Sequence, residues 1–254
     1  MLEGFEVAPG TIFDPGPRPP AEAIDVFRRV GVSNVASALG GPVAQQRLLD
    51  AHAIPRWSGT GVVVGPAVTV WHPPGSNGML MAALEVIQPG DVLVVSGPTD
   101  VAQWGDIATT TAMSKHVAGA VLDGAVRDLD RIRQMGFSLW GSRVFAGQGY
   151  RKDAGFVNVP ILVKGLLVHP DDIIVADSDG ILSIPSALVG VAHARAAARE
   201  KLEQTILDEA RNGKSPSRRP NFEIAADLLA HFTGSPRKAG MTWQAFESSP
   251  RPEA

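Results

Sequence analysis

Two short polar stretches, separated by an apolar segment, hold the side chains of this sequence that are best suited to chemistry. Asp106 follows Trp104 and Gly105, and after twenty intervening residues comes the adjacent pair Arg127 and Asp128. A guanidinium group binds a carboxylate through two parallel hydrogen bonds, and a carboxylate binds a hard divalent cation. Together these groups could hold a carboxylate substrate, bind a divalent cation and polarise a carbonyl group.

A helix and a strand are expected between the two stretches, and they should bring the polar residues together. Residues 105–117 have the pattern of a helix, residues 118–123 that of a buried strand, and residues 123–126 that of a turn. The first N–H groups of a helix lack intrahelical partners and attract anions. Open α/β sheets usually bind ligands at the carboxyl ends of their strands. The pattern therefore predicts one cleft with backbone donors, a guanidinium and two carboxylates.

The same residues also have a purely structural interpretation. Asp106 suits the start of any helix because of the helix macrodipole. Arg127 and Asp128 could form a solvated pair in a loop, and Asp128 could cap the helix that follows. Spacing alone does not decide between the two interpretations.

The rest of the chain indicates the scaffold that positions these residues. Helix and strand patterns alternate up to residue 137, and short strands with Pro, Gly and Asp at their turns follow up to residue 185. A long helix is expected at residues 186–212, ended by Gly213. This order predicts an α/β fold with a mixed sheet. The predicted parts are an irregular N-terminal arm (1–20), one domain (21–213) and a peripheral C-terminal tail (214–254).

Composition excludes several classes of protein. The 254 residues are 44% hydrophobic and 19% charged, which is enough for one large core. The net charge of −3 argues against a broad basic surface for nucleic acid, and the absence of cysteine excludes disulfides, thiolate metal sites and cysteine nucleophiles. The first residues lack the basic and apolar pattern of a signal peptide, and no stretch approaches the roughly 20 apolar residues of a membrane span. We expect a soluble cytoplasmic protein with no nucleic-acid or membrane partner.

Four segments around the polar stretches complete a resemblance to a known family. They read "GPAVTV" (65–70), "QPGDVLVV" (88–95), "GAVLDGAVRD" (119–128) and "NVPILVKGLLVHPDDIIVADSDGILSIP" (158–185). With Asp106 ahead of the Arg-Asp pair, residues 30–213 resemble the RraA-like proteins, which include 4-hydroxy-4-methyl-2-oxoglutarate and 4-carboxy-4-hydroxy-2-oxoadipate aldolases. The resemblance implies a swivelling β/β/α domain with a mixed sheet flanked by helices.

The resemblance also implies a chemistry. Such a protein would be a class II pyruvate aldolase, which cleaves a 4-hydroxy-2-oxo acid through an enolate and decarboxylates oxaloacetate as a side activity. Asp128 matches the ligand of Mg²⁺ or Mn²⁺, and Arg127 matches the residue that contacts pyruvate and its enolate. Asp106 matches the acid that positions a water as the base. The backbone from Trp104 to Ile107 matches the turn whose amides bind the substrate carboxylate.

Family members form homotrimers, or hexamers made of two trimers, with the active site between subunits. A glutamate from the C-terminal helix of the neighbouring subunit completes the site, and Glu203 is its best match here, with Glu200 as the second choice. The first half of the predicted helix 186–212 is rich in alanine, at positions 187, 192, 194, 196, 197 and 198, and these small residues permit close helix contacts. Neither glutamate has an evident partner in its own subunit. An oligomer with shared sites is therefore expected.

Two departures from the family pattern leave other functions open. Ser37 and Ser76 stand where the family often has acids near the cleft, so the resemblance specifies only the pyruvoyl half of the substrate. A different lyase or decarboxylase with an enolate intermediate, or a non-catalytic regulator on the same scaffold, remains an alternative. A Schiff base on Lys115 or Lys164 is disfavoured, because Lys115 lies in a helix without a desolvating pattern. The six histidines show no metal-type pairing.

Overall fold

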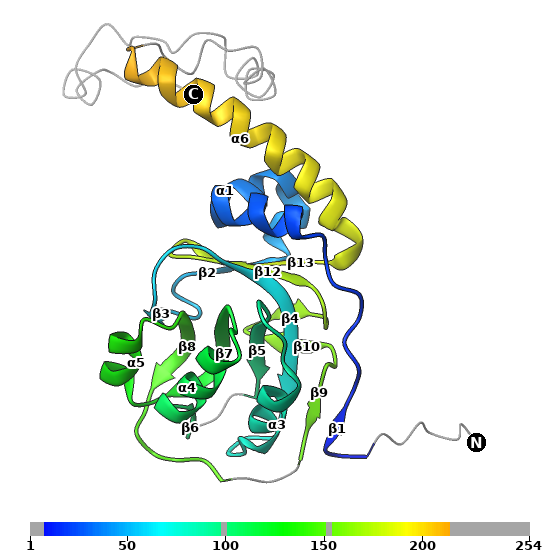
Figure 1. Ribbon diagram of the computed structural model, residues 1–254, viewed down its shortest axis with the longest axis vertical. Coiled ribbons are helices and arrows are strands. Elements are labelled where there is room, and N and C mark those ends of the chain that lie inside the picture. Colours follow the sequence, from blue (N-terminus) through cyan, green and yellow to red (C-terminus); the bar gives the residue numbers. More distant parts are fainter. Residues whose placement is uncertain (1–7, 98–100, 151–153, 214–254) are drawn as a thin grey trace, which may run out of the picture. The chain divides into compact units, whose positions relative to one another are not determined.

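The computed structural model describes residues 8–97, 101–150 and 154–213 of the chain. The chain divides into two compact units, Met1–Lys201 and Leu202–Ala254, and the predicted peripheral tail (214–254) lies outside the described residues. The first unit is built on a large mixed β-sheet with helices against it (Figure 1), so the predicted α/β fold is confirmed. The elements are β1 (Thr11–Ile12), α1 (Ala21–Leu39), α2 (Gly41–Gln45), β2 (Leu48–Asp50), β3 (Arg56–Ser58), β4 (Val63–Trp71), α3 (Gly78–Val86), β5 (Val92–Ser96), β6 (Ala102–Trp104), α4 (Asp106–Ser114), β7 (Gly119–Val126), α5 (Leu129–Met135), β8 (Leu139–Val144), β9 (Phe156–Val157), β10 (Ile161–Val163), β11 (Leu166–Val168), β12 (Ile173–Ala176), β13 (Gly180–Ile184), the 3₁₀ turn Ser186–Leu188 and α6 (Val189–Arg211).

The centre of the sheet consists of four parallel strands in the order β4-β5-β7-β8. Every residue of β5 and β7 is buried, as expected for parallel strands covered on both faces. Antiparallel strands β12, β13 and β2 extend one side and β3 the other. The segment "DSDG" (177–180) forms the tight turn that joins β12 to β13.

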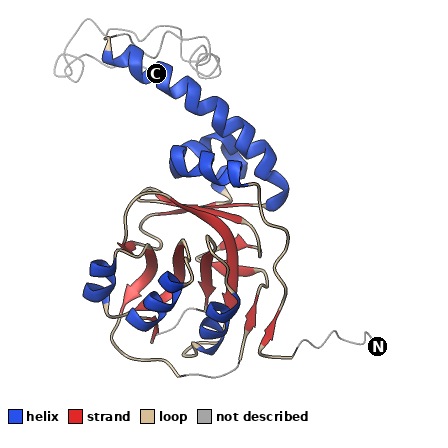
Figure 2. Ribbon diagram, in the orientation of Figure 1, coloured by secondary structure: helices blue, strands red, loops and turns tan. Residues whose placement is uncertain are grey.

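Two apolar clusters pack against this sheet, one on each face; Figure 2 shows short helices in blue beside the red strands. On one face α3, α4 and α5 bury Leu80, Ala112 and Ile132 against the strands. On the other face the hairpin of β10 and β11 packs with Trp140 and its neighbours. The helices on the first face position the polar residues near Asp106, because α4 begins and α5 follows at the carboxyl ends of their strands.

A third apolar cluster joins α1, the start of α6 and the β12–β13 side of the sheet. Gly31 has a φ of 75° and breaks α1 into two helical parts. Ala192 and Ala196 of α6 are fully buried in this cluster. These two alanines therefore serve packing within the chain, which corrects their use as evidence for contacts between subunits.

One predicted turn is wrong. Residues 123–126 do not turn but continue β7 to Val126, because Ala125 and Val126 pair with strands on both sides. Ala125 and Val126 face β8, and Val126 also faces Trp104 of β6, a short strand that the sequence pattern did not indicate. None of the helices among the described residues is long and apolar enough to cross a membrane.

Candidate functional site

The parallel pairing of β6 with β7 brings the two polar stretches together. Trp104 lies opposite Val126, and the backbone N–H of Arg127 donates to the carbonyl oxygen of Trp104 at 2.9 Å. Both strands end here, so the chain leaves β6 into α4 and leaves β7 into the Arg127-Asp128 loop. The first turn of α4, with its outward-facing N–H groups, is thereby held beside a guanidinium and a carboxylate.

Gly105 permits this close approach. A Cβ atom at position 105 would lie 2.5 Å from Oδ2 of Asp128 and 3.3 Å from Cγ of Arg127. Any side chain at position 105 would therefore displace the carboxylate of Asp128 and crowd the side chain of Arg127. Glycine at this junction is a steric requirement of the site.

Asp128 points back toward the start of α4 and does not cap its own helix. It precedes α5 in the left-handed conformation, with φ at 58°, and its side chain makes no cap hydrogen bond. Instead, Oδ2 accepts a hydrogen bond from the N–H of Asp106 at 3.3 Å and lies 3.3 Å from Nε of Arg127. The structural interpretation of Asp128 as a helix cap is therefore wrong. A non-glycine residue in this conformation is uncommon, and such residues cluster at functional sites.

Arg131, which the sequence interpretation missed, contacts the other carboxylate. Its Nη1 lies 2.5 Å from Oδ2 of Asp106, whose side chain is largely buried. The spacing in the sequence could have indicated this contact. Arg131 lies one helical turn after Asp128, so both side chains are on the side of α5 that faces α4. The result is two adjacent ion pairs, Arg131 with Asp106 and Arg127 with Asp128, joined by the hydrogen bond from the N–H of Asp106 to Asp128.

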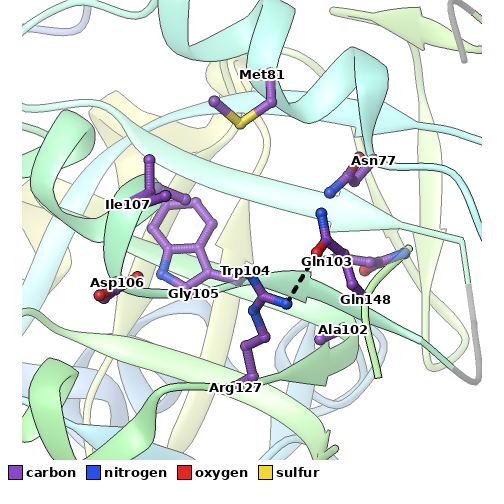
Figure 3. Close-up of a pocket in the computed structure, with 11 residues that line it drawn as sticks. Asn77, Met81, Ala102, Gln103, Trp104, Gly105, Asp106, Ile107, Arg127 and Gln148 are labelled. Atoms are coloured by element: carbon purple, nitrogen blue, oxygen red, sulfur yellow. Dashed lines mark hydrogen bonds between the residues drawn. The ribbon is translucent and has the colours of Figure 1, made fainter. Parts of the chain in front are cut away.

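Asp106 and Arg127 of these two pairs line a cavity of about 90 Å³, and Asp128 and Arg131 contact them. Figure 3 shows Arg127 on one side of it, with Asn77 and Met81 on the opposite side, and Nη1 of Arg127 donates to Oε1 of Gln148 at 3.4 Å. Ile107 is mostly exposed beside it. The lining residues are Asn77, Met81, Ala102, Gln103, Trp104, Gly105, Asp106, Ile107, Ala108, Arg127 and Gln148.

Trp104 contributes rigidity to the site through its side chain. The indole is buried, stacks on Phe137 with the ring centroids 5.8 Å apart, and donates from Nε1 to the hydroxyl of Thr109 at 2.7 Å. Thr109 in turn donates to the carbonyl oxygen of Gly105 at 3.0 Å. This chain of contacts fixes the turn between β6 and α4.

A buried histidine lies behind the site and orients a lining residue. His72 is fully buried, and burial lowers the pKa of its imidazole despite the hydrogen bond to the carbonyl oxygen of Pro73. The neutral ring with its proton on Nδ1 can donate to Pro73 and accept at Nε2 from the amide of Gln103, at 3.0 Å. The same amide nitrogen donates to the carbonyl oxygen of Gly97 at 2.9 Å. His72 therefore acts as a support and does not line the cavity.

The donor set suits a hard cation that keeps most of its water. Among the described residues, no group of three or more His, Cys, Asp or Glu side chains could hold a metal ion by itself. Mg²⁺ is commonly bound by one or two carboxylates, several waters and the substrate. Asp128, whose side chain is one-third exposed and contacts Arg127 of the cavity lining, is a carboxylate that would fit such a site.

The two glutamates proposed for a shared site differ in their surroundings. Glu200 forms a two-pronged ion pair with Arg29 of the same chain, at 3.0 and 3.2 Å, and this contact lowers the pKa of Glu200. The expectation that Glu200 lacks a partner is therefore wrong. Glu203 lies on the part of α6 that belongs to the second unit. It too has a polar or electrostatic contact, so the expectation that it lacks a partner is also wrong.

The remaining candidate residues lie away from this cavity. Ser37 is exposed and Ser76 is buried, and neither lines it. Lys115 pairs with Glu85, and Lys164 pairs with the buried Asp123 at 3.0 Å.

Comparison with known proteins gives one family model and several relatives. The model for RraA-like proteins, described as Aldolase/RraA, matches residues 32–183. A protein of Halalkalibacterium halodurans, provisionally named 4-hydroxy-4-methyl-2-oxoglutarate aldolase, is 34% identical over 125 residues, which are 48% of this chain and 60% of that protein. The 4-hydroxy-4-methyl-2-oxoglutarate aldolase of Thermus thermophilus is 32% identical over 117 residues, 45% of this chain and 71% of that protein.

A solved structure shares the fold over a longer part of the chain. Streptomyces coelicolor RraAS2, described as an unusual member of the RNase ES inhibitor RraA protein family, superimposes with a TM-score of 0.63 at 28% identity. The match covers 75% of this chain and 98% of that one. The region that the family model matches contains Asp106, Arg127 and Asp128 but ends before Glu203.

Proposed function

Because the chain belongs to the RraA-like family, we propose that it is a divalent-metal-dependent pyruvate aldolase, which cleaves a 4-hydroxy-2-oxo acid and releases pyruvate. The observation that carries the proposal is the meeting of Asp106, Arg127, Asp128 and the amide turn of α4 at one small cavity. Relatives named as aldolases support a lyase.

We assign each residue of the site a separate role in the reaction. The N–H groups at the start of α4 bind the substrate carboxylate, and Arg127 contacts the keto oxygen. Asp106, held by Arg131, orients the water that removes the proton from the C4 hydroxyl. The C3–C4 bond then breaks, its electron pair forms the enolate of pyruvate, and C4 leaves as a carbonyl. Arg127 stabilises the enolate oxygen, and protonation at C3 gives pyruvate.

Asp128 would hold the Mg²⁺ or Mn²⁺ ion. When bound, the ion would supply Lewis-acid polarisation of the keto group. Loss of CO₂ from oxaloacetate leaves the same enolate, so oxaloacetate decarboxylation is the expected side activity.

Chelation tests this mechanism directly. EDTA should abolish pyruvate release from 4-hydroxy-2-oxo acids and from oxaloacetate, and added Mg²⁺ or Mn²⁺ should restore it, because the negative charge of the enolate would be stabilised by a cation held by Asp128. Pyruvate is measured with a coupled dehydrogenase. A lysine adduct trapped with borohydride, or full activity in EDTA, would refute the metal-dependent route.

We also propose a homotrimer, or a hexamer of two trimers, in which Glu203 completes the cavity of a neighbouring subunit. Arg127→Ala and Glu203→Ala would each be inactive alone. Mixed under conditions that exchange subunits, the two variants should recover activity, because some sites then contain both intact residues. A monomer in light scattering, or an active Glu203→Ala protein, would reject the shared site.

A second candidate function is a non-catalytic regulator. The similarity to RraAS2, whose name refers to an RNase ES inhibitor family, favours it. Calorimetry separates the two proposals, because a regulator without catalytic function has no need to bind Mg²⁺ or Mn²⁺ at Asp128.

A further inference from the structure

The carboxylate of Asp106 is held by an arginine that lies outside the cavity lining. Nη1 of Arg131 is 2.5 Å from Oδ2 of Asp106, and Arg131 itself does not line the cavity. The side chain of Asp106 is 17% exposed, whereas that of Arg131 is 75% exposed. An ion pair with so exposed a partner contributes little to the stability of a fold. The main effect of this pair is therefore expected on the site.

The second carboxylate of the site lies next to the first. Oδ2 of Asp128 accepts a hydrogen bond from the backbone N–H of Asp106 at 3.3 Å and lies 3.3 Å from Nε of Arg127. Neighbouring carboxylates are a natural ligand pair for a hard divalent cation. If both were free, each would attract the ion that Asp128 is proposed to hold.

Two arginines divide these carboxylates between them. Arg127 pairs with Asp128 and lines the cavity, whereas Arg131 pairs with Asp106 from α5. Figure 3 shows the carboxylate of Asp106 directed away from the guanidinium of Arg127. The contact with Arg131 thus separates the charge of Asp106 from the pair that Arg127 forms with Asp128.

The charges of these four side chains sum to zero at neutral pH. Loss of Arg131 would leave a net charge of −1 at the site and release the carboxylate of Asp106. A negative site attracts a cation more strongly and repels the carboxylate of a 2-oxo acid. Metal binding and turnover should therefore respond to Arg131 in opposite directions.

From these contacts we propose that Arg131 is a positioning residue, which keeps the carboxylate of Asp106 from becoming a second ligand of the cation on Asp128. The inference rests on the proposed function and names the residue that separates its two carboxylates. While Arg131 holds it, Asp106 serves the water that accepts the proton of the C4 hydroxyl. Coordination positions of the cation then remain for water and substrate.

Replacement of Arg131 by Ala tests this role with two measurements on the full chain. Calorimetry should show that Mn²⁺ binds roughly tenfold more tightly, because one more carboxylate faces the ion. The kcat for pyruvate release should fall at least tenfold with the best-cleaved member of a panel of 4-hydroxy-2-oxo acids. Both sizes are those of a residue that orients a group at a metal site. A change that merely disturbed α5 would weaken metal binding and turnover together.

Two further variants serve as controls. Arg133→Ala removes the same charge from the same helix, but Arg133 contacts Asp130 at 3.7 Å and the carbonyl oxygen of Trp57 at 3.2 Å. It should leave Mn²⁺ affinity and kcat unchanged. Arg131→Lys should behave almost as the wild-type protein, because one ammonium group can pair with one carboxylate oxygen.

A double-mutant cycle shows whether Arg131 acts through Asp106. In the Asp106→Asn protein no carboxylate remains at position 106 for the arginine to hold. Addition of Arg131→Ala to that protein should then leave the Kd for Mn²⁺ unchanged. An equally large gain in affinity in this background would show that Arg131 acts on the cation by its own charge, and would overturn the inference.

The outcomes distinguish this inference from the proposed function. Mn²⁺ binding that is unchanged or weaker in Arg131→Ala, or an unchanged kcat, would overturn the inference and leave the metal-dependent aldolase intact. A wild-type protein that binds no Mn²⁺, or releases no pyruvate from any member of the panel, would overturn the proposed function and the inference with it.

Discussion

Replacement of Asp128 by Asn should abolish metal binding and nearly all pyruvate release. The change keeps the shape of the side chain but removes the charge, and an amide oxygen is a much poorer ligand for a hard cation than a carboxylate. Among the described residues that line the cavity, the one carboxylate that could compensate is Asp106, and it is paired with Arg131. Turnover should fall by at least the 10²–10³-fold that follows the loss of one stabilising group at an oxyanion site.

Calorimetry with Mn²⁺ and the rate of pyruvate release are the two measurements. Asp130→Asn is the matched control, because Asp130 lies two residues further on, is almost fully exposed and pairs only at 3.7 Å with Arg133. It should bind metal and turn over normally. A variant of Asp128 that retains more than about a tenth of the wild-type rate, against that expected cost, would show that the metal site is misplaced.

Replacement of Arg127 by Lys should be nearly as damaging, although the charge is kept. The guanidinium contacts Asp128 through Nε and Gln148 through Nη1. While it makes both contacts, this planar group also lines the cavity. One ammonium group cannot make these contacts in the same geometry. We expect kcat to fall at least tenfold, with a smaller change in KM, because the lost contact strengthens as the enolate forms.

Arg28→Lys provides the control for this substitution. Arg28 is exposed on α1 and pairs with Asp25 at 3.1 Å, so its replacement should leave both constants unchanged. Metal binding by the Arg127→Lys protein should persist, which separates this variant from Asp128→Asn. Normal kcat in Arg127→Lys would remove Arg127 from the stabilisation of the enolate.

Much of the scaffold could be predicted from local pattern. The buried strands at Val92–Ser96 and Gly119–Val126 are apolar runs, and the helices between them have recognisable starts and ends. The kink at Gly31 and the hairpin at Asp177–Gly180 also follow from residue type, because glycine supplies a positive φ that other residues avoid. Segments without such periodicity, such as β6 and β2, were missed because a three-residue strand has too few residues to show an alternation.

The sequence by itself determined which side chains could do chemistry, since the types and order of Asp106, Arg127 and Asp128 are fixed by the chain. Only the tertiary structure decided how they meet. The pairing of β6 with β7 sets the distance between the two stretches, and the left-handed conformation of Asp128 turns its carboxylate toward α4.

The partners of these residues were likewise decided in three dimensions. Arg131 forms an ion pair with Asp106, and Arg29 forms one with Glu200. Asn77 and Met81 lie across the cavity from Arg127. Each of these contacts joins segments that different elements carry, so no local pattern encodes it. The physical reason is that a helix or strand is specified by neighbours in sequence, whereas a site is specified by the packing of elements that are distant in sequence.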